Sequence, residues 1–142
     1  MSITKKILSG LFLCASLTVG AFVVTEAGNP ASEIVIEPNP AEPIVKAAKE
    51  LNRWVKEISG AELQIVTASS EGIKRHIFLT CSPEVLADFP EVEKKLSGND
   101  GYAFKERGNE LLVLGSCPKG VLNGVFQLLF KNTDIIWARP NE

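Results

Sequence analysis

The strongest pattern in this 142-residue chain is an apolar stripe between Ile44 and Ile58. Pro43 suits the first turn of a helix, and Gly60 suits the position just after its last turn. The apolar side chains recur every three or four residues, which is the spacing of one helical face: Ile44, Ala47, Ala48, Leu51, Trp54, Val55 and Ile58. The sequence therefore predicts a helix with one buried face, which places Trp54 in the core rather than under a sugar ring.

Strand-like segments surround this helix, at residues 33–37, 62–66 and 76–80. A hairpin is predicted from Tyr102 to Leu114, around the tight turn at residues 107–109. Two short helices are expected after Ser82, which would serve as the N-cap, because Pro90 should divide that segment. A last helix runs over residues 118–131. This order predicts an α+β fold, a two-layer mixed β-sheet with helices mainly on one face and a right-handed parallel first crossover.

The N-terminus has the organisation of a secretory signal peptide. Lys5 and Lys6 precede an apolar run at residues 7–24, and small residues flank Glu26. We therefore expect a signal peptide at residues 1–27, cleaved after Ala27, with the protein secreted or periplasmic. Cleavage after Ala21 and an uncleaved membrane anchor are the alternatives. The domain would occupy residues 28–134, and residues 135–142 would begin a linker. Membrane contact is expected only through the signal peptide.

The composition excludes several classes of function. The net charge of −2 and the lack of basic clusters argue against nucleic-acid binding. No metal or cofactor is expected, because His76, Cys81 and Cys117 lack ligand spacing. His76 is expected to be an ordinary strand-edge residue. The two cysteines each follow a predicted strand, and they are either bonded or separate buried thiols. The acidic residues of the middle helices, Asp88, Glu91 and Glu93, are expected to face solvent.

The stretch GSCPKGVLNG, residues 115–124, first resembles a phosphate-binding loop. Gly115 and Gly120 have the glycine spacing of such a loop, but Val121 and Leu122 stand where the loop requires a lysine and a serine or threonine. The stretch is better interpreted as a strand-to-helix joint with Ser116 as the cap. Gly120 and Gly124 share a helical face and predict a close backbone approach. Lys119 stands near the helix start, where anions bind.

The last helix is apolar on most sides, whereas a surface helix has a single apolar stripe. One side can pack on the sheet. The apolar residues on its other sides predict a further neighbour for this helix, either a second domain or a partner subunit.

Three segments together resemble the N-terminal domain of α-glucuronidases, the glycoside hydrolase family 67 type, a fold similar to the second domain of β-hexosaminidases. The helix ends in Ile-Ser-Gly-Ala at residues 58–61, the hairpin begins with Asp-Gly-Tyr at residues 100–102, and Gly115, Pro118, Lys119, Gly120 and Gly124 match the glycine-rich joint. Trp137 matches a tryptophan that lies shortly before the next domain.

The resemblance implies a non-catalytic domain, because catalysis in such enzymes belongs to a (β/α)₈ barrel. That barrel is expected C-terminal to Glu142, and no position here matches the family's catalytic residues. The chain is then a non-catalytic N-terminal accessory domain, and a fragment, of a secreted, polysaccharide-degrading glycoside hydrolase. The alternative is a free-standing carbohydrate-binding or protein-interaction module. Lys119, Trp137, Gly120 and Gly124 are the candidate contacts to a ligand or to another domain.

Overall fold

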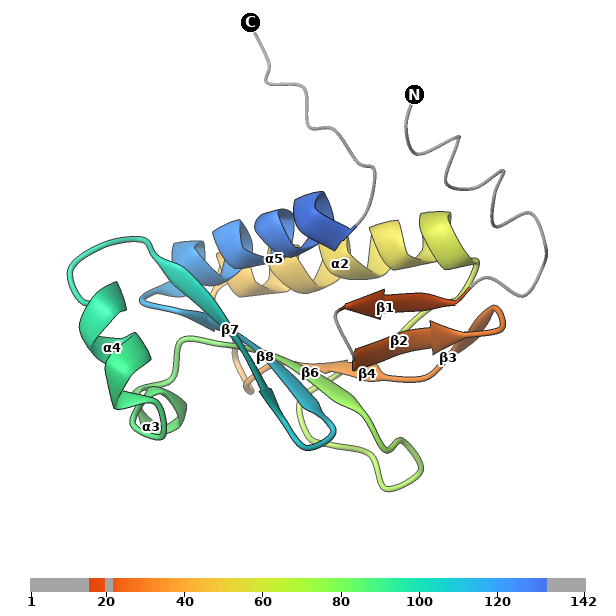
Figure 1. The fold of residues 1–142 in the computed structure, drawn as a ribbon, viewed down its shortest axis with the longest axis horizontal. Coiled ribbons are helices and arrows are strands. Elements are labelled where there is room, and N and C mark those ends of the chain that lie inside the picture. Colours follow the sequence, from red (N-terminus) through yellow and green to blue (C-terminus); the bar gives the residue numbers. More distant parts are fainter. Residues whose placement is uncertain (1–15, 20–21, 133–142) are drawn as a thin grey trace, which may run out of the picture.

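The computed structural model describes residues 16–19 and 22–132, so Trp137 and the expected linker at 135–142 lie outside the described residues (Figure 1). The elements are β1 (Leu17–Val19), β2 (Phe22–Glu26), β3 (Asn29–Pro30), β4 (Glu33–Val35), α2 (Glu42–Ser59), β5 (Ile65–Val66), β6 (His76–Thr80), α3 (Pro83–Leu86), α4 (Pro90–Leu96), β7 (Tyr102–Arg107), β8 (Glu110–Gly115) and α5 (Pro118–Asn132). No helix among these residues is both long and apolar enough to cross a membrane.

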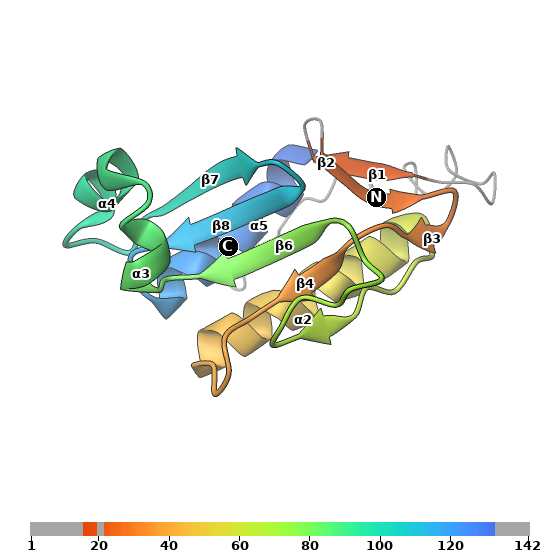
Figure 2. The same ribbon diagram turned by 90° about the horizontal axis from the view of Figure 1, so that it is seen from below.

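A five-stranded mixed sheet forms the centre of the fold, in the order β5-β4-β6-β8-β7. Strands β5, β4, β6 and β8 run parallel to one another, and β7 pairs antiparallel with β8 at the edge of the sheet. The long helices α2 and α5 lie side by side on one face, and α3 and α4 lie at one end of the other face (Figures 1 and 2). The predicted α+β mixed sheet is confirmed.

Helix α2 forms as its sequence predicts. Pro43 lies in the first turn, and Gly60 ends the helix with a left-handed φ of 80°, donating its N–H to the carbonyl of Lys56. Glycine adopts this conformation without the steric cost of a Cβ atom. Trp54 is only partly buried against the core, with the guanidinium of Arg53 4.8 Å from its ring.

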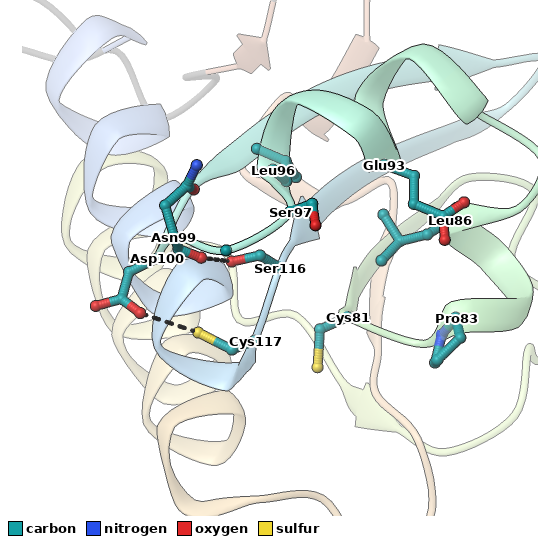
Figure 3. A pocket seen from close by; sticks show the side chains of 11 residues that line it. Cys81, Pro83, Leu86, Glu93, Leu96, Ser97, Asn99, Asp100, Ser116 and Cys117 are labelled. Carbon is teal, nitrogen blue, oxygen red and sulfur yellow. Dashed lines mark hydrogen bonds between the residues drawn. The ribbon is translucent and has the colours of Figure 1, made fainter.

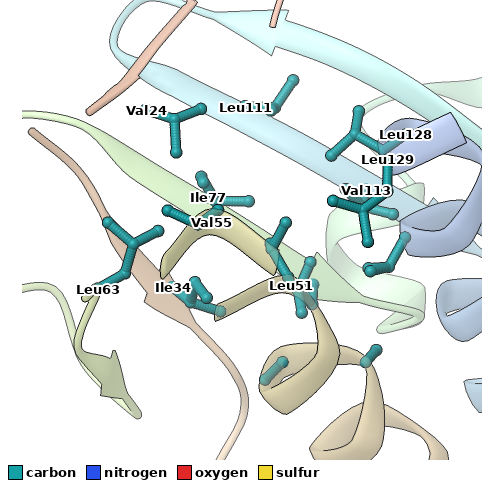
Figure 4. Packing of buried hydrophobic residues seen from close by; sticks show 14 of the residues in the cluster. Val24, Ile34, Leu51, Val55, Leu63, Ile77, Leu111, Val113, Leu128 and Leu129 are labelled. Atoms are coloured by element: carbon teal, nitrogen blue, oxygen red, sulfur yellow. The ribbon is translucent and has the colours of Figure 1, made fainter. Parts of the chain in front are cut away.

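Alternation along the strands divides the core between the two faces of the sheet. In β8, Leu111 and Val113 point toward α2 and α5, whereas Leu112 and Leu114 point toward the short helices α3 and α4. Figure 4 shows the larger cluster, in which Leu51 and Val55 of α2 meet residues from the sheet and from α5. Pro90 divides α3 from α4 as expected, but the Ser82 side chain makes no capping hydrogen bond. The backbone N–H of Ser82 donates a hydrogen bond to Thr80 Oγ1 at 2.9 Å.

A second, three-stranded antiparallel sheet contains β1 and β2, which lie within the expected signal peptide at residues 1–27, and β3, which follows it. Phe22 and Val24 of β2 are buried in the main core. Thr25 is fully buried and accepts a hydrogen bond from the Leu17 N–H at 2.9 Å. The described fold therefore begins before Gly28, and cleavage after Ala27, which stays a prediction, would remove β1 and β2.

Helix α5 has more neighbours within the chain than its sequence suggested. It packs against α2 as well as against β7 and β8, and it also contacts β1. These contacts bury Val121, Val125, Leu128 and Leu129. What remains is a narrow stripe of partly buried side chains that ends at Phe130, whose exposed fraction is 54%. Helix α2 thus covers one side of α5, and a neighbour outside this chain for the remaining stripe stays a prediction.

Candidate functional site

A surface cavity of about 460 Å³ lies where β6 and β8 end and α5 begins (Figure 3). Ligands of open sheets with parallel strands tend to bind beyond the carboxyl ends of those strands, so this is the first place to look for a site. The lining comes from the ends of β6 and β8, from α3 and α4, and from the turn before β7: Cys81, Pro83, Leu86, Glu93, Leu96, Ser97, Gly98, Asn99, Asp100, Ser116 and Cys117.

The glycine-rich joint is tied to the turn before β7 by hydrogen bonds. The Ser116 N–H donates to the carbonyl of Gly101 at 3.1 Å, and the Ser116 hydroxyl donates to the carbonyl of Asn99. The Cys117 thiol donates to Asp100 Oδ1 at 3.4 Å. The expectation that Ser116 caps α5 is wrong, because α5 begins at Pro118 and Cys117 stands at the cap position, where its carbonyl accepts the Val121 N–H.

Lys119 has a partner that the sequence did not reveal. Its ammonium lies 3.2 Å from Asp100 Oδ2, and both side chains are more than half exposed. The hydrogen bond from Lys119, followed by the one from Cys117, lowers the pKa of Asp100 below its ordinary value. Asp100 thus neutralises the cation that could have drawn an anion to the start of α5. Nothing in the sequence around Lys119 indicated this pairing across the joint.

The shared face of Gly120 and Gly124 packs inside the domain. A Cβ atom at Gly120 would collide with the carbonyl oxygen of Gly101, and one at Gly124 would lie 2.8 Å from Val113 Cγ1 and 3.1 Å from Tyr102 Cβ. The predicted close backbone approach is confirmed at Gly120, which meets the turn just before β7, whereas Gly124 meets side chains of β7 and β8. Whether Lys119 and Trp137 contact a ligand or another domain stays a prediction.

His76 is the first residue of β6, which agrees with the expected strand-edge position, and it lies beside a buried carboxylate that the sequence did not reveal. Its Nε2 atom lies 3.3 Å from Oε1 of Glu33, whose side chain is 1% exposed. The same carboxylate oxygen accepts the Ser70 N–H at 2.6 Å. The two residues stand opposite each other in the β4–β6 ladder. This pair lies at the opposite end of the parallel strands from the cavity, so the two do not form one site.

A second depression, of about 380 Å³, lies between β7 and α5. It is lined by three aromatic rings and two amide side chains: Tyr102, Asn123, Phe126, Gln127 and Phe130. The Tyr102 ring also contacts that of Phe104, with centroids 5.6 Å apart. Among the described residues, no charged side chain lines this surface, so the lining suits an uncharged partner.

The acidic residues Asp88, Glu91 and Glu93 are exposed, as expected, and two of them form ion pairs. Asp88 lies 3.2 Å from a guanidinium nitrogen of Arg107, and Glu91 lies 3.3 Å from the ammonium of Lys105. Glycoside hydrolysis normally requires two carboxyl groups that face each other across a substrate. Within residues 16–19 and 22–132, no group of His, Cys, Asp and Glu side chains could hold a metal ion. The larger cavity is lined by two carboxylates, Glu93 and Asp100, and Asp100 is engaged by Lys119 and by Cys117.

Comparison with solved structures gives a match to a "GH138 enzyme targeting pectin rhamnogalacturonan II". The identity is 18% and the TM-score is 0.49, over 72% of this chain. The chain spans only 14% of the length of that enzyme. No curated protein matches the chain.

Comparison with protein families gives a match over nearly the whole described fold. The model described as "Glycosyl hydrolase family 67 N-terminus" matches residues 23–128, from the second residue of β2 to the last third of α5. The matched region contains both long helices in full or in large part, the central sheet and the glycine-rich joint. The chain therefore belongs to the family of glycosyl hydrolase family 67 N-terminal domains.

Proposed function

We propose that this chain is the non-catalytic N-terminal accessory domain of a secreted, α-glucuronidase-like glycoside hydrolase that acts on polysaccharide, and that it is part of a longer polypeptide with a catalytic (β/α)₈ barrel after Glu142. The family match over residues 23–128 carries the proposal. The ion pairs of Asp88 with Arg107 and of Glu91 with Lys105 agree with it, since these two exposed carboxylates are each paired with a basic side chain.

Of the two cleavage sites that the sequence leaves open, the one after Ala21 fits the fold better. It would release a chain that begins with Phe22 and keeps β2, whose Phe22 and Val24 side chains belong to the core. N-terminal sequencing of the exported protein tests this choice. A first residue of Phe22 would support it, and a first residue of Gly28 would overturn it.

The apolar stripe of α5 is the face we assign to the catalytic domain. Leu122, Phe126 and Phe130 recur every four residues on one side of the helix, which the sheet and α2 leave partly uncovered. In the longer polypeptide, Phe130→Ser should lower the melting temperature of the catalytic domain, whereas in this chain alone it should leave the melting temperature nearly unchanged. An equal fall of the melting temperature in the longer polypeptide and in this chain alone would contradict docking of the catalytic domain along this face. Glu106→Ser, on the exposed edge of β7, is the control.

A second function is favoured by the aromatic depression between β7 and α5. Aromatic rings beside amide groups are suited to an uncharged sugar, whose ring can stack while its hydroxyl groups bond to amides. Titration with neutral xylo-oligosaccharides, followed by NMR, tests this. Saturable shifts at Tyr102, Asn123 and Gln127 that Phe130→Ser abolishes would favour a carbohydrate-binding module. Unchanged spectra would favour the accessory domain.

A further inference from the structure

Two thiols border the cavity at the end of the parallel strands. Cys81 is the first residue after β6, and Cys117 lies between β8 and α5. Both are free and partly buried, and both belong to the lining of the same cavity. Figure 3 shows them on neighbouring walls, with the sulfur of Cys117 directed at Asp100.

The register of the sheet brings the two residues close together. Thr80 and Leu114 are the last pair of the parallel β6–β8 ladder, and Cys81 and Gly115 are the residues that follow them in the chain. The chain then folds back on itself, because a Cβ atom at Gly115 would lie only 2.8 Å from the carbonyl oxygen of Cys117. The backbone of Cys117 therefore packs against Gly115, the last residue of β8. Adjacent strands are about 4.8 Å apart, and a disulfide joins Cα atoms about 4.4–6.8 Å apart.

The electrostatics of Cys81 agree with this proximity. Burial raises the pKa of the Cys81 thiol, and the nearby charges of Glu37 and Cys117 raise it further. The Cys117 side chain is held by one weak contact, its 3.4 Å hydrogen bond to Asp100. A change of rotamer at Cys117 is therefore cheap.

We propose that Cys81 and Cys117 form a disulfide bond across this cavity when the protein meets a small-molecule disulfide oxidant such as oxidised glutathione. One thiolate attacks the oxidant and releases one reduced glutathione, and the other thiolate then attacks the mixed disulfide and releases the second. The two thiols lose two protons and two electrons, and the oxidant gains them. The bond would join the end of β6 to the start of α5 and free Asp100 from Cys117.

Peptide mapping tests the bond directly. The full chain is oxidised in its native state with oxidised glutathione, alkylated, and digested with trypsin. The expected product is residues 76–94 linked to residues 108–119, with a combined mass that reduction separates. A linkage of either peptide to Cys14, a lasting glutathione adduct or alkylation of both thiols in the folded chain would overturn the proposal.

The thermal stability provides a second readout. Oxidation should raise the melting temperature by about 5–10 °C, because the bond constrains the unfolded chain from residue 81 to residue 117. A reductant should reverse the rise. Cys81→Ser and Cys117→Ser should each abolish it while retaining the native circular dichroism spectrum. Linked peptides found only after denaturation would also count against the bond.

Discussion

The Glu33 carboxylate lies 3.3 Å from the His76 imidazole, at the start of two neighbouring parallel strands. The same carboxylate accepts the Ser70 N–H, so one buried side chain holds both β6 and the loop before it. The residues of this contact are far apart in the sequence. It joins the start of β4 to the start of β6 and to the loop that precedes β6. The contact contributes to the fold rather than to a ligand site.

Replacing Glu33 should destabilise the domain. Glu33→Leu removes the acceptor of the Ser70 N–H and the carboxylate beside His76, and it should reduce the free energy of unfolding by about 3 kcal/mol. Glu33→Gln keeps an acceptor oxygen and should cost only about 1 kcal/mol. Urea denaturation measures both values. Glu106→Gln, on the exposed end of β7, is the matched control, and equal losses at both positions would refute the structural role of Glu33.

The glycine face of α5 should not accept larger residues. Gly120→Ala places a methyl group against the backbone of Gly101. The gain in helix propensity, about 1 kcal/mol, is smaller than the strain, and a net loss of about 1–3 kcal/mol is expected. Gly124→Ala meets side chains that can shift and should cost less. At Gly72, where a Cβ atom meets nothing within 4 Å, alanine should be neutral or slightly stabilising in the same denaturation assay.

The Lys119–Asp100 pair should be visible in an acid titration. The lowered pKa of Asp100 means that its contribution to stability is present above the ordinary aspartate pKa and is lost as the pH falls through the folded value. Lys119→Met should move the Asp100 pKa upward, toward its ordinary value. Carboxylate-detected NMR between pH 2 and pH 6 measures the shift. Lys46→Met, on the exposed side of α2, should leave the Asp100 titration unchanged.

The N-terminal strands should be needed for full stability. A chain that begins at Gly28 lacks Phe22 and Val24, which are 6% and 1% exposed. Burial of each such side chain contributes about 1.5–3 kcal/mol, so this chain should unfold at a markedly lower urea concentration than one that begins at Phe22. Equal midpoints for the two chains would mean that β2 is dispensable.

Local patterns in the sequence predicted the elements better than their contacts. The helix from Ile44 to Ile58, its end at Gly60 and the break at Pro90 all follow from local periodicity and backbone preference. The partners of His76 and Lys119 did not follow, because Glu33 and Asp100 reach them only through the folded sheet.

The N-terminal strands show another limit of sequence patterns. Apolar residues such as Phe22 and Val24 occur in signal peptides as well as in buried strands, so the sequence alone did not show that these two side chains pack in the core. Similarly, the free hydroxyl of Ser116 suggested a helix cap, but the turn at Asn99 takes it. Local rules do not include competition from residues that are distant in the sequence.

The accessory role of the domain is tested most directly by measuring turnover with the purified chain alone. Aryl glucuronides and aryl hexosaminides, at high protein concentration, report any hydrolysis through the released phenol. The proposed non-catalytic function predicts release no faster than in buffer. Release that increases with protein concentration and is lost in Asp100→Asn or Glu93→Gln, the two acidic residues that line the cavity, would contradict it.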